Sequence, residues 1–329
     1  MRSPSAALRR RRPNAVFIPR LSSKLHVTNG DSVVYTWRKG GLVGTQLPWR
    51  DALHDGPVPA GLALPELSAL RAQYLGVAGY GNPIKLGHDF QKRDATIARC
   101  MEFDEVVLWF EHDLYDQLQL LQILDYLAGQ PLPLGQLQLI QSDDFLGMLA
   151  APELLALQNS RRPVLQQTLR GASEVWAAYR APTPERLFEM HTAVPTQLRH
   201  MTSALRRLFE EYPSVQSGIS RTQRHILEAV AEGAHAKEDI FRLAQLREEA
   251  AFLGDAPFYK RFEELCDASA PLLQAIQNGY RLTPLGRRVL AGAEDWLSLR
   301  GCDRWIGGVH LAGTDVWRWD EGAAMFAAP

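Results

Sequence analysis

The chain has 329 residues, with 36 basic and 37 acidic side chains and 46% hydrophobic residues. This length suits about two domains with buried cores, so the fold needs no disulfide framework. The three cysteines, Cys100, Cys266 and Cys302, have neither CxxC nor zinc-binding spacing, and we expect reduced thiols in a cytoplasmic protein. No apolar run approaches the roughly 20 residues of a transmembrane helix, so we expect no membrane partner.

Charge is distributed unevenly along the chain. Residues 1–30 contain seven basic residues and no acidic one, which leaves 29 basic and 37 acidic residues over 31–329. The segment 1–23 is rich in Arg, Pro and Ser without a periodic apolar face, so we expect a disordered basic tail. A nucleic-acid-contacting arm, an unstructured extension and an over-long start of the chain all remain open for it. The acidic body argues against a polyanion binder.

Between residues 24 and 150 the sequence alternates short strands with helices. Glu105–Phe110 is the clearest strand, because it is an apolar run rich in β-branched and aromatic residues. Repeated β-α units with crossover helices predict a Rossmann-like α/β domain with a mostly parallel sheet. The predicted strands are Lys24–Thr28, Val43–Leu47, Glu105–Phe110 and Gln136–Ile140. One predicted helix ends near residue 39, and the others span 65–78, 89–101 and 114–127.

The rest of the chain is predicted to be mostly helical. Residues 151–213 form a helical connector whose helices each have a proline near the start. Residues 214–329 then show the order of a winged helix-turn-helix: three helices from Ser220 onward, a hairpin at Asn278-Gly279 and a short helix. Asn-Gly between two apolar runs is a strong hairpin signal. A tryptophan-rich hairpin over 303–320 is expected to close the domain.

Ionisable and polar side chains gather where the predicted strands end. The carboxyl ends of parallel strands meet at one edge of a sheet, which is where ligands bind in open α/β folds. Carboxylates packed together there raise one another's pKa or recruit a cation. The groups are Asn29, Gly30, Asp31 and Ser32 after the first strand, Asp51, His54 and Asp55 after the second, Glu111, His112, Asp113, Asp116 and Gln117 after the third, and Asp143 and Asp144 after the fourth.

These residues predict a divalent-metal site with acid-base groups beside it. Oxygen-rich ligands suit Mg²⁺ or Mn²⁺ better than structural zinc, and an imidazole or a carboxyl group could move a proton. The predicted metal ligands are Asp31, Glu111, Asp113 and Asp116, and the predicted catalytic residues are Glu111, His112 and His54. The predicted ligand-binding residues are Asn29, Gly30, Ser32, Asp51, Asp55 and Gln117, with Arg71 and Arg93 to neutralise a phosphate.

Simpler interpretations remain open for several of these residues. Asp31, Ser32 or Asp113 could cap a helix, because a side-chain oxygen there satisfies a free backbone N–H. Asp55 could belong to a turn, and helix arginines are commonly exposed. The triplet Glu111-His112-Asp113 is harder to explain structurally, because ionisable groups next to a buried strand are costly unless solvated or ligated.

The winged-helix-like region has an even charge balance. Residues 220–292 contain ten basic and ten acidic residues. The candidate recognition helix, 257–267, carries Lys260 and Arg261 followed by three carboxylates, which would repel DNA phosphates. Arg281, Arg287 and Arg288 could still contact a backbone, so DNA contact and protein contact both remain open.

Four stretches, Leu25–Ser32, Trp49–Pro57, Val106–Gln117 and Asp303–Leu311, resemble the uncharacterised bacterial family named domain of unknown function 1835. The resemblance to the defining domain covers about residues 25–150, and the later regions resemble the longer members. The family has no established activity, so the resemblance implies a domain boundary and little chemistry.

Two functions therefore remain open. In the first, the α/β domain binds a small phosphorylated or nucleotide-like ligand at an acidic site that could hold a divalent metal. An enzyme of this kind would perform metal-dependent phosphoryl transfer or hydrolysis. In the second, the protein is a regulator whose α/β domain senses a ligand and whose winged helix contacts DNA or a protein partner.

Overall fold

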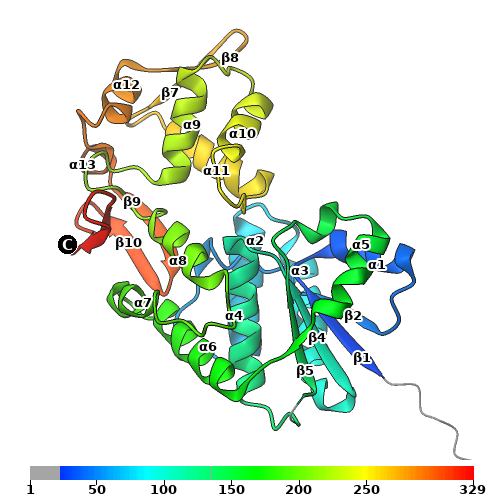
Figure 1. Ribbon diagram of the computed structural model, residues 1–329. Coiled ribbons are helices and arrows are strands. Elements are labelled where there is room, and N and C mark those ends of the chain that lie inside the picture. Colours follow the sequence, from blue (N-terminus) through cyan, green and yellow to red (C-terminus); the bar gives the residue numbers. More distant parts are fainter. Residues whose placement is uncertain (1–22, 134) are drawn as a thin grey trace, which may run out of the picture.

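The computed structural model describes residues 23–133 and 135–329 (Figure 1). The predicted basic tail lies outside the described residues except for Ser23. The N-terminal part is built on a five-stranded sheet in the order β2-β1-β4-β5-β6, in which only β6 runs antiparallel to its neighbour. This mixed, mostly parallel sheet with helices confirms the α/β prediction. The strands are β1 (Lys24–Thr28), β2 (Thr45–Pro48), β4 (Glu105–Phe110), β5 (Leu137–Gln141) and β6 (Arg162–Pro163).

Helices cover both faces of the sheet, because the side chains of β4 are apolar on both faces. Successive side chains of a strand point to opposite faces. Val107 and Trp109 pack with α1 (Asp31–Gly40) and α5 (Ala151–Ala156) on one face. Leu108 and Phe110 pack on the other face, in the main core with residues of three further helices. These are α2 (Leu64–Val77), α3 (Pro83–Ile97) and α4 (Leu114–Ala128).

The chain adds strands to the sheet in one direction up to β2 and in the opposite direction from β4 onward, so the order of the strands reverses between β1 and β4. From β1 the chain passes through α1 to β2 on one side, and it then returns past β1 to β4 on the other side. The chain leaves these two neighbouring strands at Asn29 and Glu111. Such a reversal opens a crevice at the carboxyl ends of the strands, and open α/β sheets bind their ligands there.

Two predicted elements of the α/β part differ from the observed ones by more than one residue at an end. The helix predicted at 89–101 begins earlier, because the Asn82 side chain caps α3 by accepting hydrogen bonds from the N–H groups of Ile84 and Lys85. The strand predicted at Val43–Leu47 is shifted to Thr45–Pro48.

A helical region follows, and then several small sheets. The helices are α6 (Gln166–Tyr179), α7 (Glu185–Met190), α8 (Met201–Phe209), α9 (Arg221–Ala231), α10 (Lys237–Gln245), α11 (Asp255–Leu265), α12 (Pro284–Leu290) and α13 (Trp296–Arg300). The hairpin predicted at Asn278-Gly279 joins β7 (Leu273–Ile276) to β8 (Gly279–Leu282), with Gly279 at a φ of +125°.

The first C-terminal hairpin pairs with a strand of the α/β part. β9 (Cys302–Gly307) pairs with β10 (Val309–Gly313) and also, in parallel, with β3 (Gly56–Pro57). Trp319 lies outside this hairpin, in a second one formed by β11 (Arg318–Asp320) and β12 (Met325–Ala327). The expected closing hairpin is therefore two hairpins, and the first is attached to the α/β part.

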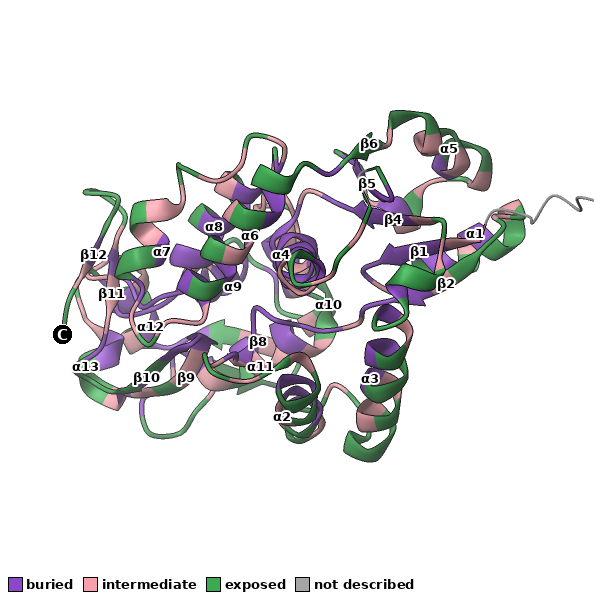
Figure 2. Cartoon of the chain, turned by 90° about the horizontal axis from the view of Figure 1, so that it is seen from below, coloured by how far each residue is buried: buried purple, intermediate pink, exposed green. Residues whose placement is uncertain are grey.

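Helix α4 lies at the centre of the molecule. Figure 2 shows it between the sheet and the helical region, and residues on all its sides are buried, including Gln117, Gln119 and Gln122. Its first turn follows β4 directly and therefore lies at the reversal of the strand order. None of the helices in the described part of the chain is long and apolar enough to cross a membrane.

Candidate metal centre

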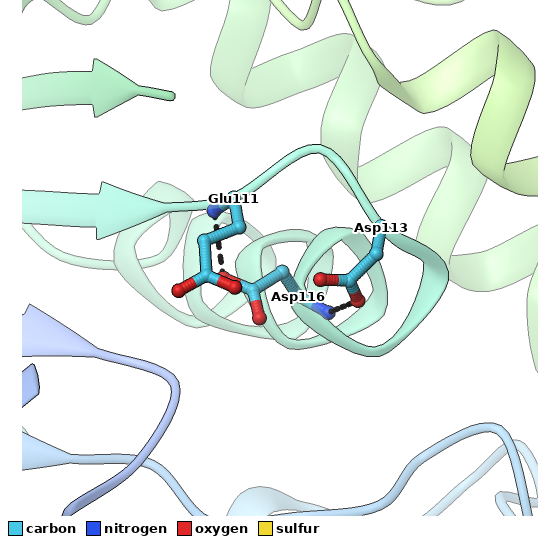
Figure 3. A group of neighbouring side chains, drawn as sticks. All are labelled: Glu111, Asp113 and Asp116. Atoms are coloured by element: carbon cyan, nitrogen blue, oxygen red, sulfur yellow. Dashed lines mark hydrogen bonds between the residues drawn. The ribbon is translucent and has the colours of Figure 1, made fainter. Parts of the chain in front are cut away.

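Three buried carboxyl groups gather between the end of β4 and the first turn of α4 (Figure 3). Glu111 follows β4, Asp113 is the N-cap of α4, and Asp116 lies in the first turn. One carboxylate oxygen from each lies within 4.8 Å of those from the other two. The residues are 4%, 4% and 0% exposed. Oxygens this close can share one cation.

Hydrogen bonds from the backbone and from one amide hold the three groups in place. The N–H of Leu146 donates to Glu111 Oε1 at 2.7 Å, and the N–H of Glu111 donates to Asp116 Oδ1 at 2.7 Å. Asp116 Oδ2 accepts from Asn29 Nδ2 at 2.7 Å, which connects the end of β1 to the first turn of α4. The N–H of Asp116 donates to Asp113 Oδ1 at 3.1 Å, so Asp113 caps α4 and belongs to the cluster as well.

Burial makes ionisation of these groups unfavourable. It raises the pKa of Glu111 to about 7, with the nearby Asp113 as the second cause. Burial also raises the pKa of Asp113 to about 7, and it raises the pKa of Asp116 well above its usual range, where Asp113 and Glu111 add repulsion. At neutral pH the cluster therefore holds protons or requires a compensating cation.

The cluster has no cationic side chain paired with it among the described residues. In the same part of the chain, the other buried carboxylates each pair with at least one arginine: Asp51 with Arg71, Asp55 with Arg261, Asp94 with Arg93, and Glu211 with Arg207 and Arg304. A buried negative charge is stable only when paired or ligated. Among the buried carboxylates of the described residues, only those of the cluster therefore lack an arginine partner.

Asp31, which we predicted as a metal ligand, does not belong to this cluster. Its side chain is 68% exposed and pairs with Arg50 at 2.6 Å, which keeps the pKa of Asp31 below its usual range. Arg50 stands at the end of β2 with a φ of +62°, a strained conformation for a residue with a side chain. Asp31 does not cap α1 either, since Gly30 is the N-cap, and Ser32 is exposed.

His112 and Gln117 lie beside the cluster. Gln117 is fully buried and donates from Nε2 to the carbonyl of Glu111 at 2.6 Å, so it supports the backbone. His112 is half-buried, with its ring near those of Phe145 and His200. Burial lowers the pKa of His112, so the ring is neutral at pH 7.

Asp51, Arg71 and Arg93 form an internal ion-pair network. Arg71 is 0% exposed and donates to Asp51 Oδ1 at 3.0 Å and to the carbonyls of Ala52 and Asp55 at 2.7 Å. Arg93 is 2% exposed and stacks 4.2 Å from the Trp49 ring. Both interpretations of Arg71 and Arg93 are therefore wrong: they neither contact a phosphate nor lie exposed on a helix. Their charges, together with that of Asp51, hold the loop after β2.

Asp55 and His54 belong to the contact between the α/β part and α11. Asp55 pairs with Arg261 at 2.8 Å and with Lys260 at 3.2 Å, so it is not available to a ligand as we had predicted. The His54 ring packs edge-on against Tyr115 and Phe252, and both ring nitrogens lack a hydrogen-bond partner among the described residues. Burial lowers the pKa of His54 to about 4.

Sequence reasoning missed the buried Glu211, which accepts hydrogen bonds from Arg207, Arg304 and Thr222. Nothing local marks this residue, because its partners lie on α8, α9 and β9. The backbone N–H of Leu146 was also missed, and no side-chain pattern could have indicated it.

Comparison with models of known protein families and with curated proteins finds no match for this chain. The resemblance to the domain of unknown function 1835 family depends on the four stretches that carry it and stays a prediction.

Proposed function

We propose that Glu111, Asp113 and Asp116 form a Mg²⁺ or Mn²⁺ site at which the α/β part binds a small phosphorylated or nucleotide-like ligand. The observation that carries the proposal is that these three buried carboxylates lie within 4.8 Å of one another without a cationic partner in the described chain. The donors are all carboxylate oxygens, a set that suits hard cations such as Mg²⁺ and Mn²⁺.

The place of the cluster in the sheet supports a ligand beside the cation. The strand order, with its reversal between β1 and β4, favours a Rossmann-like α/β part. The N-terminus of α1 lies next to this reversal, and its N-cap Gly30 offers no side chain to the first amides. A Cβ added at Gly30 would meet no atom within 4 Å, so there is room for a phosphate oxygen. Helix N-termini favour anions.

The chemistry that fits such a site is metal-dependent phosphoryl transfer or hydrolysis. A bound cation would polarise a phosphoryl oxygen or lower the pKa of a bound water. Glu111 is the group that would hold or move a proton, since it lies in the cluster at the end of β4. His112, which was also predicted for this role, places its ring against Phe145 and His200 instead. We leave His54 out of this role because Tyr115 and Phe252 enclose its ring.

The second candidate function concerns the module at 220–292. Its order of α9, α10, α11 and the β7–β8 hairpin supports a winged-helix-like fold. The basic residues of α11, Lys260 and Arg261, are bound to Asp55. This observation favours α11 as a contact with the α/β part over α11 as a DNA-reading helix.

The metal proposal is tested by titrating Mn²⁺ and Mg²⁺ into the wild type, the double variant Glu111→Gln/Asp113→Asn and the control Asp31→Asn. The control removes a carboxylate at the same sheet edge but outside the cluster. We expect both cations to raise the Tm of the wild type and of Asp31→Asn, since ligand binding stabilises the folded state, and to leave the double variant unchanged. Equal shifts in all three proteins would remove the cluster as the site.

A further inference from the structure

A cavity lies beside the loop that carries the cluster, where His112 and Leu114 line it. It has a volume of about 220 Å³ and lies between the start of α4, α8 and the start of α9. Leu114, Ala204 and Ala250 give it apolar walls, and His112, Arg206 and Arg221 are among its polar lining residues. A largely apolar cavity with a few polar groups is typical of a small-molecule site.

Two of the polar groups lack partners. Arg206 is exposed, and its guanidinium forms no ion pair or hydrogen bond with any residue in the described ranges. His112 Nδ1 is buried and likewise has no hydrogen-bond partner there. Arg221, in contrast, is neutralised by Glu210 at 2.8 Å and Glu249 at 2.6 Å. The free donors of the cavity are therefore the Arg206 guanidinium and the His112 imidazole, which can carry its proton on Nε2 because Nδ1 is buried.

We infer that this cavity binds the phosphate group of a small phosphomonoester, with Arg206 and His112 as its donors. A guanidinium matches two phosphate oxygens at once, and an imidazole N–H can donate to a third. The apolar walls would contact the carbon part of the ester.

The carboxylate cluster affects this site, because Glu111 and Asp113 flank His112 in the chain. Their negative charges would repel a phosphate, and a cation on the cluster removes that repulsion. The inference rests on the proposed function only for the effect of the metal, since the cavity and its two donors are present without it.

The test measures binding of inorganic phosphate and propyl phosphate by calorimetry at pH 7, first without metal and then with Mg²⁺. We compare the wild type with Arg206→Gln and His112→Gln, and we use Arg199→Gln as the control. Arg199 is also an exposed arginine near His112, but it pairs with Asp143 and does not line the cavity.

We expect propyl phosphate to bind at least about threefold more tightly than inorganic phosphate, because it also buries apolar surface. Arg206→Gln should weaken binding about tenfold, and His112→Gln should weaken it severalfold, because each removes a hydrogen bond to a charged group. Arg199→Gln should change it less than twofold. Absence of binding both without and with Mg²⁺, or equal losses in Arg206→Gln and Arg199→Gln, would overturn the inference.

The metal arm separates this inference from the proposed function. Phosphate binding that needs Arg206 but does not respond to Mg²⁺ would support the cavity and count against the metal site. Mg²⁺ binding at the cluster without any phosphate binding would support the metal site and overturn the inference about the cavity.

Discussion

At the scale of single residues, Glu111, Asp113 and Asp116 differ from the buried Asp51 in the partners that the fold gives them. Asp51 receives a guanidinium donor from Arg71, and an ionised carboxylate in the interior is stable with such a partner. The cluster receives only backbone and amide donors. Its carboxyl groups are therefore protonated or repel one another, and stability must depend on pH.

Metal-free wild type should lose stability relative to Glu111→Gln as the pH rises from 5 to 8. The pKa of Glu111 is raised in the folded state to about 7. Its contribution is therefore full below the unfolded value near about 4.3 and is lost as the pH rises through about 7. We expect the difference in unfolding free energy to change by about 1–3 kcal/mol in urea denaturation.

The same experiment on Asp31→Asn provides the control. Because the pKa of Asp31 is lowered by Arg50, this variant should show no relative gain as the pH rises. Parallel pH profiles for wild type and Glu111→Gln would contradict the assignment of the raised pKa to the cluster.

At the scale of elements, α11 is fixed to the α/β part by charge. Lys260 and Arg261 both reach Asp55 in the loop after β2, and Lys260 Nζ also lies 2.7 Å from the Tyr74 hydroxyl on α2. Asp55 also accepts from Tyr80 at 3.1 Å. The Arg261–Asp55 pair is buried, so removal of Arg261 leaves an incompletely compensated charge on Asp55.

Arg261→Gln should therefore loosen α11. We expect a loss of about 3–5 kcal/mol in unfolding free energy and faster hydrogen exchange of the α11 amides by at least about tenfold. Arg281→Gln on the exposed face of β8 is the matched control, with an expected change below about 0.5 kcal/mol. Unchanged exchange in α11 would show that the Asp55 contacts do not hold this helix.

At the scale of the whole molecule, one connected apolar core includes residues from the α/β part, the helical region and the C-terminal hairpins. Leu25 of β1, Leu118 of α4, Phe209 of α8 and Leu311 of β10 all belong to it. Figure 2 shows the buried α4 between the two halves. The pairing of β3 with β9 adds a backbone connection between distant parts of the chain.

A fragment that ends at residue 150 should therefore fail to fold as a stable monomer, although the sequence predicts a domain boundary there. The fragment would expose the side of α4 that packs against α6 and α8, and exposed apolar surface of this kind promotes aggregation. Circular dichroism melting and size-exclusion chromatography test this. A cooperative transition from a monomeric fragment would show that the α/β part folds independently.

The amino-acid sequence by itself determined the α/β class and the position of the acidic triplet. These features are local, since apolar runs mark the strands and Glu111-His112-Asp113 directly follows the clearest one. The Asn278-Gly279 hairpin was predictable for the same reason.

Only the tertiary structure decided which strand-end residues meet. Asp31 and Asp116 were equally plausible ligands in the sequence, yet Arg50 holds Asp31 at the surface while the first turn of α4 buries Asp116. Arg71 and Asp55 also looked like free site residues until their partners were known. The physical reason is that a charged residue's role depends on which opposite charge the fold brings near it, and those partners lie 20 and 206 positions away in the chain.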